Sequence, residues 1–199
     1  MGMYTALSLG VELDIPQNGQ VAELLRYMTG DLDELPKLAL VDHDEANQSH
    51  PFFSCSRWNF MMRCDSYYFD WDTRFTLRWD PIANNYFLCG VSNLKNYGDE
   101  INQFLDWLRP FIHRSVAGYI GWTMYEEDEF PTILMLKCKK DGDRELVKLH
   151  VGELIRMIEN GDSLLNQLMP GVGNCVVNVA QLNAQFMYAD KLKKELSYE

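Results

Sequence analysis

Aromatic rings and arginines alternate along residues 54–95, and this segment carries the residue types best suited to binding a ligand. Flat rings stack on nucleobases, and a guanidinium group binds a phosphate through paired hydrogen bonds. We therefore expect this segment to hold a nucleotide or another small anionic ligand, either in a binding protein or in an enzyme. The residues expected to contact that ligand are Arg57, Trp58, Arg63, Tyr67, Tyr68, Trp71, Arg78 and Trp79.

A structural interpretation of the same segment stays open at this stage. Aromatic residues are favoured in strands, where their rings fill the core, and the arginines between them would then lie on the solvent-facing side. The sequence alone does not distinguish core packing from a ligand-binding surface.

A second candidate surface is acidic. Glu126, Glu127, Asp128 and Glu129 follow one another at the expected turn of a hairpin. Such a run can imitate phosphate groups and occupy the basic groove of a partner protein. The alternative is a solvated turn that keeps the protein in solution, because acidic turns are common.

The sequence contains no established metal, cofactor or catalytic motif. His43, Asp44, Glu45 and His50 are metal-binding residue types, but their spacing matches no known site. The Gly-Val-Gly of residues 171–173 lacks the further glycine and the Lys-Ser/Thr pair of phosphate-binding loops. Motifs of a nucleophile with its base are also missing. We therefore expect neither a metal nor a cofactor, and a binding protein rather than an enzyme.

The net charge of −11 is distributed unevenly along the 199 residues. Residues 1–53 hold nine acids and two bases, and residues 96–130 hold seven acids and two bases. Residues 54–95, in contrast, hold five bases and four acids. The overall charge disfavours duplex nucleic acid as a partner, because both molecules are negative. A protein with a basic surface suits the acidic parts, and a small anionic ligand suits residues 54–95.

The cysteines and the hydropathy indicate the compartment. The five cysteines are widely spaced and form no Cys-x-x-Cys pair, which is typical of free, mostly buried thiols in a reducing cytoplasm. No apolar run approaches the ~20 residues that span a bilayer, and the N-terminus lacks the features of a secretory signal. We therefore expect a cytoplasmic protein without a membrane partner. The cysteines are Cys55, Cys64, Cys89, Cys138 and Cys175.

The elements that must position these residues follow from hydrophobic periodicity. Residues 56–63 fit either a short helix or a strand. Helical spacing predicts helices at 21–28, 98–108, 154–158 and 186–196. Alternation predicts strands at 4–14, 65–69, 74–80, 86–92, 119–125, 132–139 and 144–149.

This order of elements predicts an α+β fold. We expect an antiparallel sheet with helices on one face, arranged in a split βαβ-like plan. The sheet domain should cover residues 1–140, and a small α-rich C-terminal subdomain should cover residues 141–199. A strand at 4–14 or at 144–149 offers an edge through which a homodimer could form.

Three short motifs resemble a group of small uncharacterised proteins of bacteria and their mobile elements. The motifs are Ser66-Tyr67-Tyr68-Phe69, then Ser92-Asn93-Leu94-Lys95-Asn96-Tyr97, and then Tyr125-Glu126-Glu127 ahead of Pro131-Thr132. The resemblance covers residues 3–137 and implies no activity, because the group has none assigned. With the acidic surface and the missing catalytic motifs, we hypothesise an inhibitor, encoded by a phage or mobile element, that blocks a host defence or nucleic-acid-handling protein.

Overall fold

The chain folds into two units, residues 1–149 and residues 150–199. This division comes from a computed structural model, which describes residues 4–35, 49–63, 74–116, 118–139 and 143–159. It falls later than the boundary expected at residue 140, because Arg144–His150 joins the sheet as strand β6.

The first unit has the expected α+β architecture. Three short 3-10 helices, η1 (Pro51–Ser54), η2 (Trp58–Phe60) and η4 (Arg109–Phe111), accompany its helices and strands. The main elements are β1 (Thr5–Leu13), α1 (Gln20–Thr29), β2 (Thr76–Asp80), β3 (Asn85–Leu94), α2 (Glu100–Leu108), β4 (Gly118–Tyr125), β5 (Thr132–Cys138) and β6.

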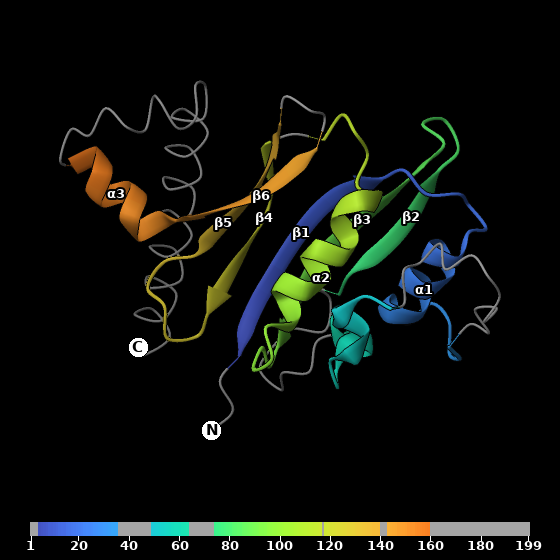
Figure 1. The fold of residues 1–199 in the computed structure, drawn as a ribbon. Helices are drawn as coiled ribbons and strands as arrows, with labels where there is room; N and C mark the ends of the chain where they lie inside the picture. Colours follow the sequence, from blue (N-terminus) through green and yellow to red (C-terminus); the bar gives the residue numbers. More distant parts are fainter. Residues whose placement is uncertain (1–3, 36–48, 64–73, 117, 140–142, 160–199) are drawn as a thin grey trace, which may run out of the picture. The chain divides into compact units, whose positions relative to one another are not determined.

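The six strands form one sheet in the order β2-β3-β1-β4-β5-β6 (Figure 1). β3 pairs antiparallel with both β2 and β1, and β1 also pairs antiparallel with β4. β1 and β2 are therefore parallel to each other with β3 between them, and the connection from β1 to β2 contains α1. β3 and β4 are related in the same way through α2. The split βαβ plan is thus confirmed, and β5 and β6 extend it beyond β4.

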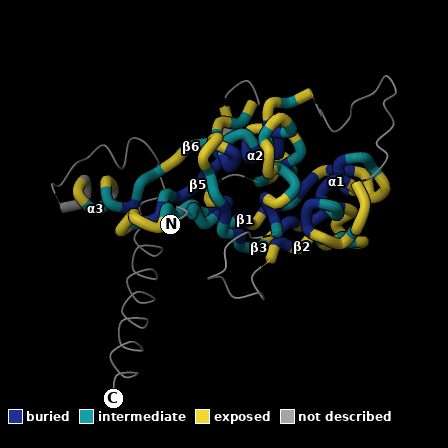
Figure 2. The backbone as a smooth tube through the Cα atoms, turned by 90° about the horizontal axis from the view of Figure 1, so that it is seen from below, coloured by how far each residue is buried: buried dark blue, intermediate teal, exposed yellow. Residues whose placement is uncertain are grey.

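Both helices of the first unit cover the same face of the sheet (Figure 2). Leu7, Leu9, Val11 and Leu13 are buried on β1, whereas Gly10 between them is exposed. Each buried aliphatic side chain contributes about 1.5–3 kcal/mol, so a shift of one residue along β1 would be costly. The helices contribute Val21, Leu24, Leu25, Met28, Ile101, Phe104, Leu105 and Leu108 to the same core.

Strand β1 lies in the interior of the sheet, between β3 and β4. The expectation that residues 4–14 could form a dimer through a free edge is therefore wrong. β1 and β4 approach closely at Gly121, where an added Cβ would clash with the carbonyl oxygen of Ser8. In the described part of the sheet, the edge strands are β2 and β6.

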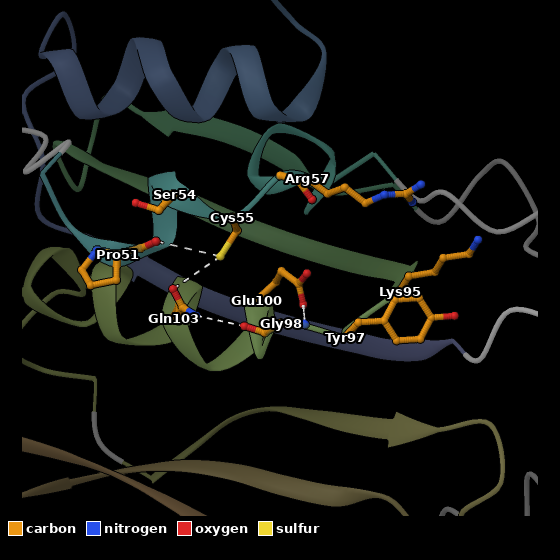
Figure 3. Close-up of a pocket in the computed structure, with 10 residues that line it drawn as sticks. Pro51, Ser54, Cys55, Arg57, Lys95, Tyr97, Gly98, Glu100 and Gln103 are labelled. Carbon is orange, nitrogen blue, oxygen red and sulfur yellow. Dashed lines mark hydrogen bonds between the residues drawn. The ribbon is translucent and has the colours of Figure 1, made fainter.

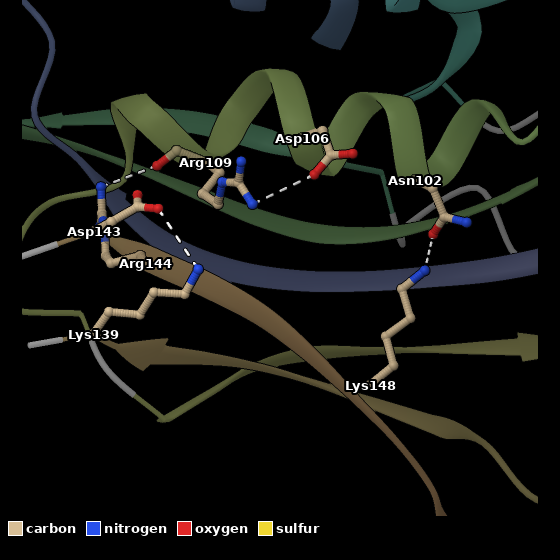
Figure 4. A network of polar contacts seen from close by, with 7 residues as sticks. All are labelled: Asn102, Asp106, Arg109, Lys139, Asp143, Arg144 and Lys148. Carbon is tan, nitrogen blue, oxygen red and sulfur yellow. Dashed lines mark hydrogen bonds and ion pairs between the residues drawn. The ribbon is translucent and has the colours of Figure 1, made fainter. Parts of the chain in front are cut away.

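Strand β6 is tied to α2 and its C-terminal extension by polar contacts (Figure 4). Arg144 donates hydrogen bonds to the carbonyl oxygen of His113 at 3.1 Å and to that of Arg109 at 3.0 Å. Lys148, farther along β6, donates to Oδ1 of Asn102 on α2. β6 spans Arg144–His150 and confirms the strand expected at residues 144–149. The Arg144 side chain satisfies backbone carbonyl groups that follow the helix.

Most local predictions are confirmed. The hairpins expected at 74–92 and 119–139 are β2–β3 and β4–β5. Asp80 Oδ1 accepts hydrogen bonds from the amides of Ile82 and Ala83, which closes the first hairpin. Residues 56–63 contain η2 rather than a strand.

The described part of the second unit is the helix α3 (Val151–Glu159), which confirms the helix expected at 154–158. The elements expected at 65–69 and 186–196 lie outside the described residues. None of the helices in the described ranges is long and apolar enough to cross a membrane.

Candidate functional site

A pocket of about 740 Å³ opens at the N-terminal end of α2 (Figure 3). This volume lies within the range of small-molecule sites, roughly 300–1,000 Å³. Three segments that are distant in the sequence contribute its described lining: η1 with the turn after it, the loop after β3, and the first turn of α2. Its lining includes the charged, polar and aromatic side chains of Cys55, Arg57, Lys95, Tyr97, Glu100 and Gln103.

Aromatic packing holds η1 beside α2. Phe52 is fully buried, and its ring centroid lies 5.4 Å from that of Phe104 and 5.6 Å from that of Trp107. Phe53 and Trp58 add edge contacts to this cluster. Aromatic pairs contribute about 0.5–1.5 kcal/mol each beyond the area that they bury. The cluster therefore fixes the segment that brings Cys55 and Arg57 to the pocket.

Side chains around the start of α2 organise the loop that precedes it. Oδ1 of Asn96 accepts a hydrogen bond from the amide of Ile101 at 3.0 Å. Gln103 Nε2 donates to the carbonyl oxygen of Gly98, and Oε2 of Glu100 accepts from the amide of the same glycine, both at 2.9 Å. A carboxylate is also favoured at a helix N-terminus by the helix dipole. These bonds fix the loop that carries the Tyr97 ring.

One end of the pocket is cationic. Arg57 and Lys95 extend on the same side of the pocket, and the Tyr97 ring lies beside them (Figure 3). Lys95 Nζ lies 5.6 Å from the ring centroid of Tyr4, a cation–π contact. Tyr97 is 65% exposed and so presents an accessible ring surface. This end combines two positive charges with an aromatic face, which suits an anionic ligand that contains a ring.

The opposite end of the pocket presents hydrogen-bond acceptors. Glu100 is only 6% exposed, and among the described residues its Oε1 receives no hydrogen bond. Oε1 of Gln103 accepts from the Cys55 thiol at 3.4 Å. The same thiol lies 3.9 Å from the carbonyl oxygen of Pro51. Carboxylate, amide and carbonyl oxygens therefore gather at this end.

The surroundings of the Cys55 thiol disfavour its ionised form. Burial, and then the negative charges of Glu100 and Asp99, raise the pKa of the Cys55 thiol above its ordinary value. The nucleophile of cysteine enzymes is the thiolate, which a lowered pKa favours. The electrostatics of the pocket therefore keep this sulfur protonated at neutral pH, as a hydrogen-bond donor to Gln103.

The acidic run lies close to the cationic end of the pocket. Residues 126–129 are exposed and connect β4 to β5. The amide of Glu126 donates to the carbonyl oxygen of Tyr4 at 3.0 Å, and the Tyr4 ring in turn contacts Lys95. Desolvation, and then the charges of Glu127 and Glu126, raise the pKa of Tyr125. Tyr4 thus contacts both the acidic turn and the cationic end.

The structure does not gather the eight predicted ligand residues in one place. Arg57 lines the pocket, but Arg63 instead donates to the carbonyl oxygens of Tyr27 and, at 3.3 Å, Met28 near the end of α1. It therefore caps a helix, which is a structural role. Tyr67, Tyr68 and Trp71 lie outside the described residues.

The remaining three predicted ligand residues pack against the core or lie on strand β2. Trp58 belongs to the aromatic cluster beside α2. Trp79 packs edge-on against Tyr86, with centroids 4.9 Å apart. Arg78 is exposed on β2, where it pairs in register with Phe87.

Segment 54–95 is partly core and partly surface. Phe75 and Tyr86 are buried, whereas Phe60 is 46% and Phe87 is 40% exposed. Of the cysteines described as free, Cys55 is half-buried and Cys89 is exposed, so the expectation of buried thiols is wrong for these two. The segment therefore supports both interpretations of its aromatic pattern, at different residues.

The metal-binding residue types do not form a site within the described ranges. His50 Nδ1 accepts a hydrogen bond from the amide of Phe52 at 3.2 Å and so caps η1. Residues 43–45 and 171–173 lie outside the description. Among the described residues, no three His, Cys, Asp or Glu side chains are placed to hold a metal ion.

Among the described residues that line the pocket, only Arg57 was predicted to bind a ligand. Lys95 and Tyr97 belong to the motif of residues 92–97, which was noted only for its resemblance to other proteins. Glu100 follows in the first turn of the helix, where an acid is usual. The one usable signal was a basic and an aromatic residue immediately before a helix N-terminus.

This chain was compared with known protein families, proteins and structures. No protein-family model, curated protein or solved structure matches this chain.

Proposed function

We propose that this protein is a non-enzymatic binding protein whose pocket at the N-terminal end of α2 takes a small anionic ligand that contains a ring. The observation that carries this proposal is the convergence of Arg57 and Lys95 beside the Tyr97 ring. An arginine guanidinium and a lysine ammonium both bind phosphate or carboxylate oxygens, and an exposed ring stacks on a planar group.

Two further observations support binding over catalysis. The electrostatic environment of Cys55 opposes formation of the thiolate, which removes the obvious nucleophile of the pocket. The loop before α2 is fixed by hydrogen bonds from Asn96, Glu100 and Gln103. A pocket with preset walls binds without a large ordering cost.

The proposal is tested by calorimetric titration with nucleoside monophosphates. Lys95→Met and Arg57→Met should each weaken binding by about tenfold, because each removes a charge-assisted hydrogen bond. Lys137→Met and Arg78→Met are matched controls, since both residues are exposed on strands and neither lines the pocket. Equal losses in the pocket variants and the controls would overturn the proposal, as would the absence of binding to any monophosphate.

A second proposal concerns the exposed acidic turn between β4 and β5. We propose that it binds a host protein with a basic surface, in keeping with the inhibitor hypothesis. The supporting observation is that all of Glu126, Glu127, Asp128 and Glu129 are exposed on one turn. Clustered charge of one sign steers partners of the opposite sign.

The acidic turn is tested by replacing its four acids with serine. At low salt, immobilised wild-type protein should retain basic host proteins, and the variant should lose them. Raised ionic strength should have the same effect on the wild type, because exposed charges are screened within about 8–10 Å. Retention of the same proteins by the variant would contradict this proposal and leave the pocket proposal untouched.

A further inference from the structure

Within the proposed pocket, one charged group has an unused bonding position. Glu100 is 6% exposed, and its Oε2 is occupied by the amide of Gly98 at 2.9 Å. Among the described residues, Oε1 of the same carboxylate accepts no hydrogen bond. Oε1 is still reached by solvent, because the one described side-chain atom that is fully buried without a partner is Ser92 Oγ. An N–H group that enters the pocket can therefore donate a charge-assisted hydrogen bond to Oε1.

The neighbours of Glu100 also present acceptors. Gln103 uses one N–H of its Nε2 on the carbonyl oxygen of Gly98. Its Oε1 accepts from the Cys55 thiol and, as a carbonyl oxygen, has a second lone pair. A ligand group that enters this end therefore gains most by donating hydrogen bonds. A group that only accepts would face the Glu100 charge.

The two ends together define a ligand with two chemical features. Arg57 and Lys95 supply positive charge that suits an anionic group, and the Tyr97 ring beside them favours a planar one. At the opposite end, Glu100 lies on the side of Cys55 and Gln103 that faces the cations (Figure 3). A phosphate at the cationic end would thus leave a base within the reach of the carboxylate, in a pocket of about 740 Å³.

We infer that the pocket selects nucleoside monophosphates whose base carries an exocyclic amino group, and that Glu100 accepts a hydrogen bond from that group. This inference rests on the proposed function, because it presupposes that the anionic group is bound by Arg57 and Lys95. Glu100 is thereby a specificity-determining residue, whereas the two cations supply binding that is common to all monophosphates.

The experiment compares ligands that differ only in the amino group. AMP is titrated against purine riboside 5′-monophosphate, and CMP against the pyrimidin-2-one riboside 5′-monophosphate. At least one amino-bearing nucleotide should bind about tenfold more tightly than its analogue, as expected for a hydrogen bond to a charged group. Equal affinities within both pairs, with binding still dependent on Lys95, would overturn this inference alone. Failure of all four ligands to bind would overturn the proposed function as well.

Glu100→Gln provides an independent measurement. The amide oxygen of glutamine can keep the bond from Gly98, and its NH2 group would then replace the acceptor that faces the ligand. We expect this variant to lose the preference for the amino-bearing nucleotide while it binds the analogue at least as well as the wild type does. A melting temperature close to that of the wild type establishes that it folds. A preserved tenfold preference in the folded variant would contradict the role assigned to Glu100.

Discussion

The two ends of helix α2 use similar residue types for different purposes. At the C-terminal end, Arg144 donates to the carbonyl oxygen of Arg109 (Figure 4) and also to that of His113. At the N-terminal end, Arg57 and Lys95 line a pocket of about 740 Å³ together with the buried carboxylate of Glu100 (Figure 3). Arg144 satisfies carbonyl groups of the chain, whereas Arg57 and Lys95 both line the pocket.

The difference shows how a charged residue can be assigned to stability or to binding. A polar side chain that serves the fold has its partners within the chain, as the carbonyl oxygens at the end of a helix require. A side chain that serves a ligand is fixed in place but keeps a bonding position directed into a cavity. Glu100 has both properties, since one oxygen caps the loop at Gly98 and the other has no described donor.

The largest expected effect comes from removing the aromatic cluster that supports the N-terminal end. Trp107 is 1% exposed, and its ring packs against Phe52, Phe104 and Phe111. Trp107→Ala should lower the free energy of unfolding by about 3–5 kcal/mol. Chemical denaturation measures this loss. A loss below about 1 kcal/mol would show that η1 is not held by these rings and would remove the basis for a preset pocket.

A smaller effect should follow at the C-terminal end. Arg144→Met removes two hydrogen bonds to backbone carbonyl oxygens, so we expect a loss of about 1–3 kcal/mol in the free energy of unfolding. Nucleotide affinity should not change, because Arg144 does not line the pocket. Lys137→Met, an exposed control on β5, should alter stability by less than about 0.5 kcal/mol. A change in nucleotide affinity with Arg144→Met would contradict the assignment of the C-terminal end of α2 to stability alone.

The smallest expected effect is on the reactivity of Cys55. Its pKa is raised, so at pH 8 less thiolate is present than at an ordinary cysteine, and alkylation by iodoacetamide should be slow. Glu100→Gln removes one of the charges that raise the pKa, and it should accelerate alkylation of Cys55 a few-fold. The exposed Cys89 is the internal control, and peptide mass spectrometry follows both sites separately. An unchanged rate at Cys55 would show that Glu100 does not act on the thiol.

The sequence by itself determined the elements and their order. The apolar alternation of residues 4–14 and the helical spacing of residues 98–108 are local properties, and both elements formed where the pattern placed them. The order of strands and helices was sufficient to predict the split βαβ plan. The sequence also indicated Arg57 and the acidic run of residues 126–129 as candidate binding residues, because charge and residue type are read directly from it.

Only the tertiary structure decided which of these residues meet. Lys95 and Glu100 reach Arg57 because aromatic packing of Phe52 against Trp107 brings η1 to α2. Similarly, Arg63 caps α1 through contacts between residues far apart in the chain. Such contacts depend on how whole elements pack rather than on local spacing. For this reason the sequence showed which residues are charged or aromatic. It could not show which of them contact other parts of the protein and which line a pocket.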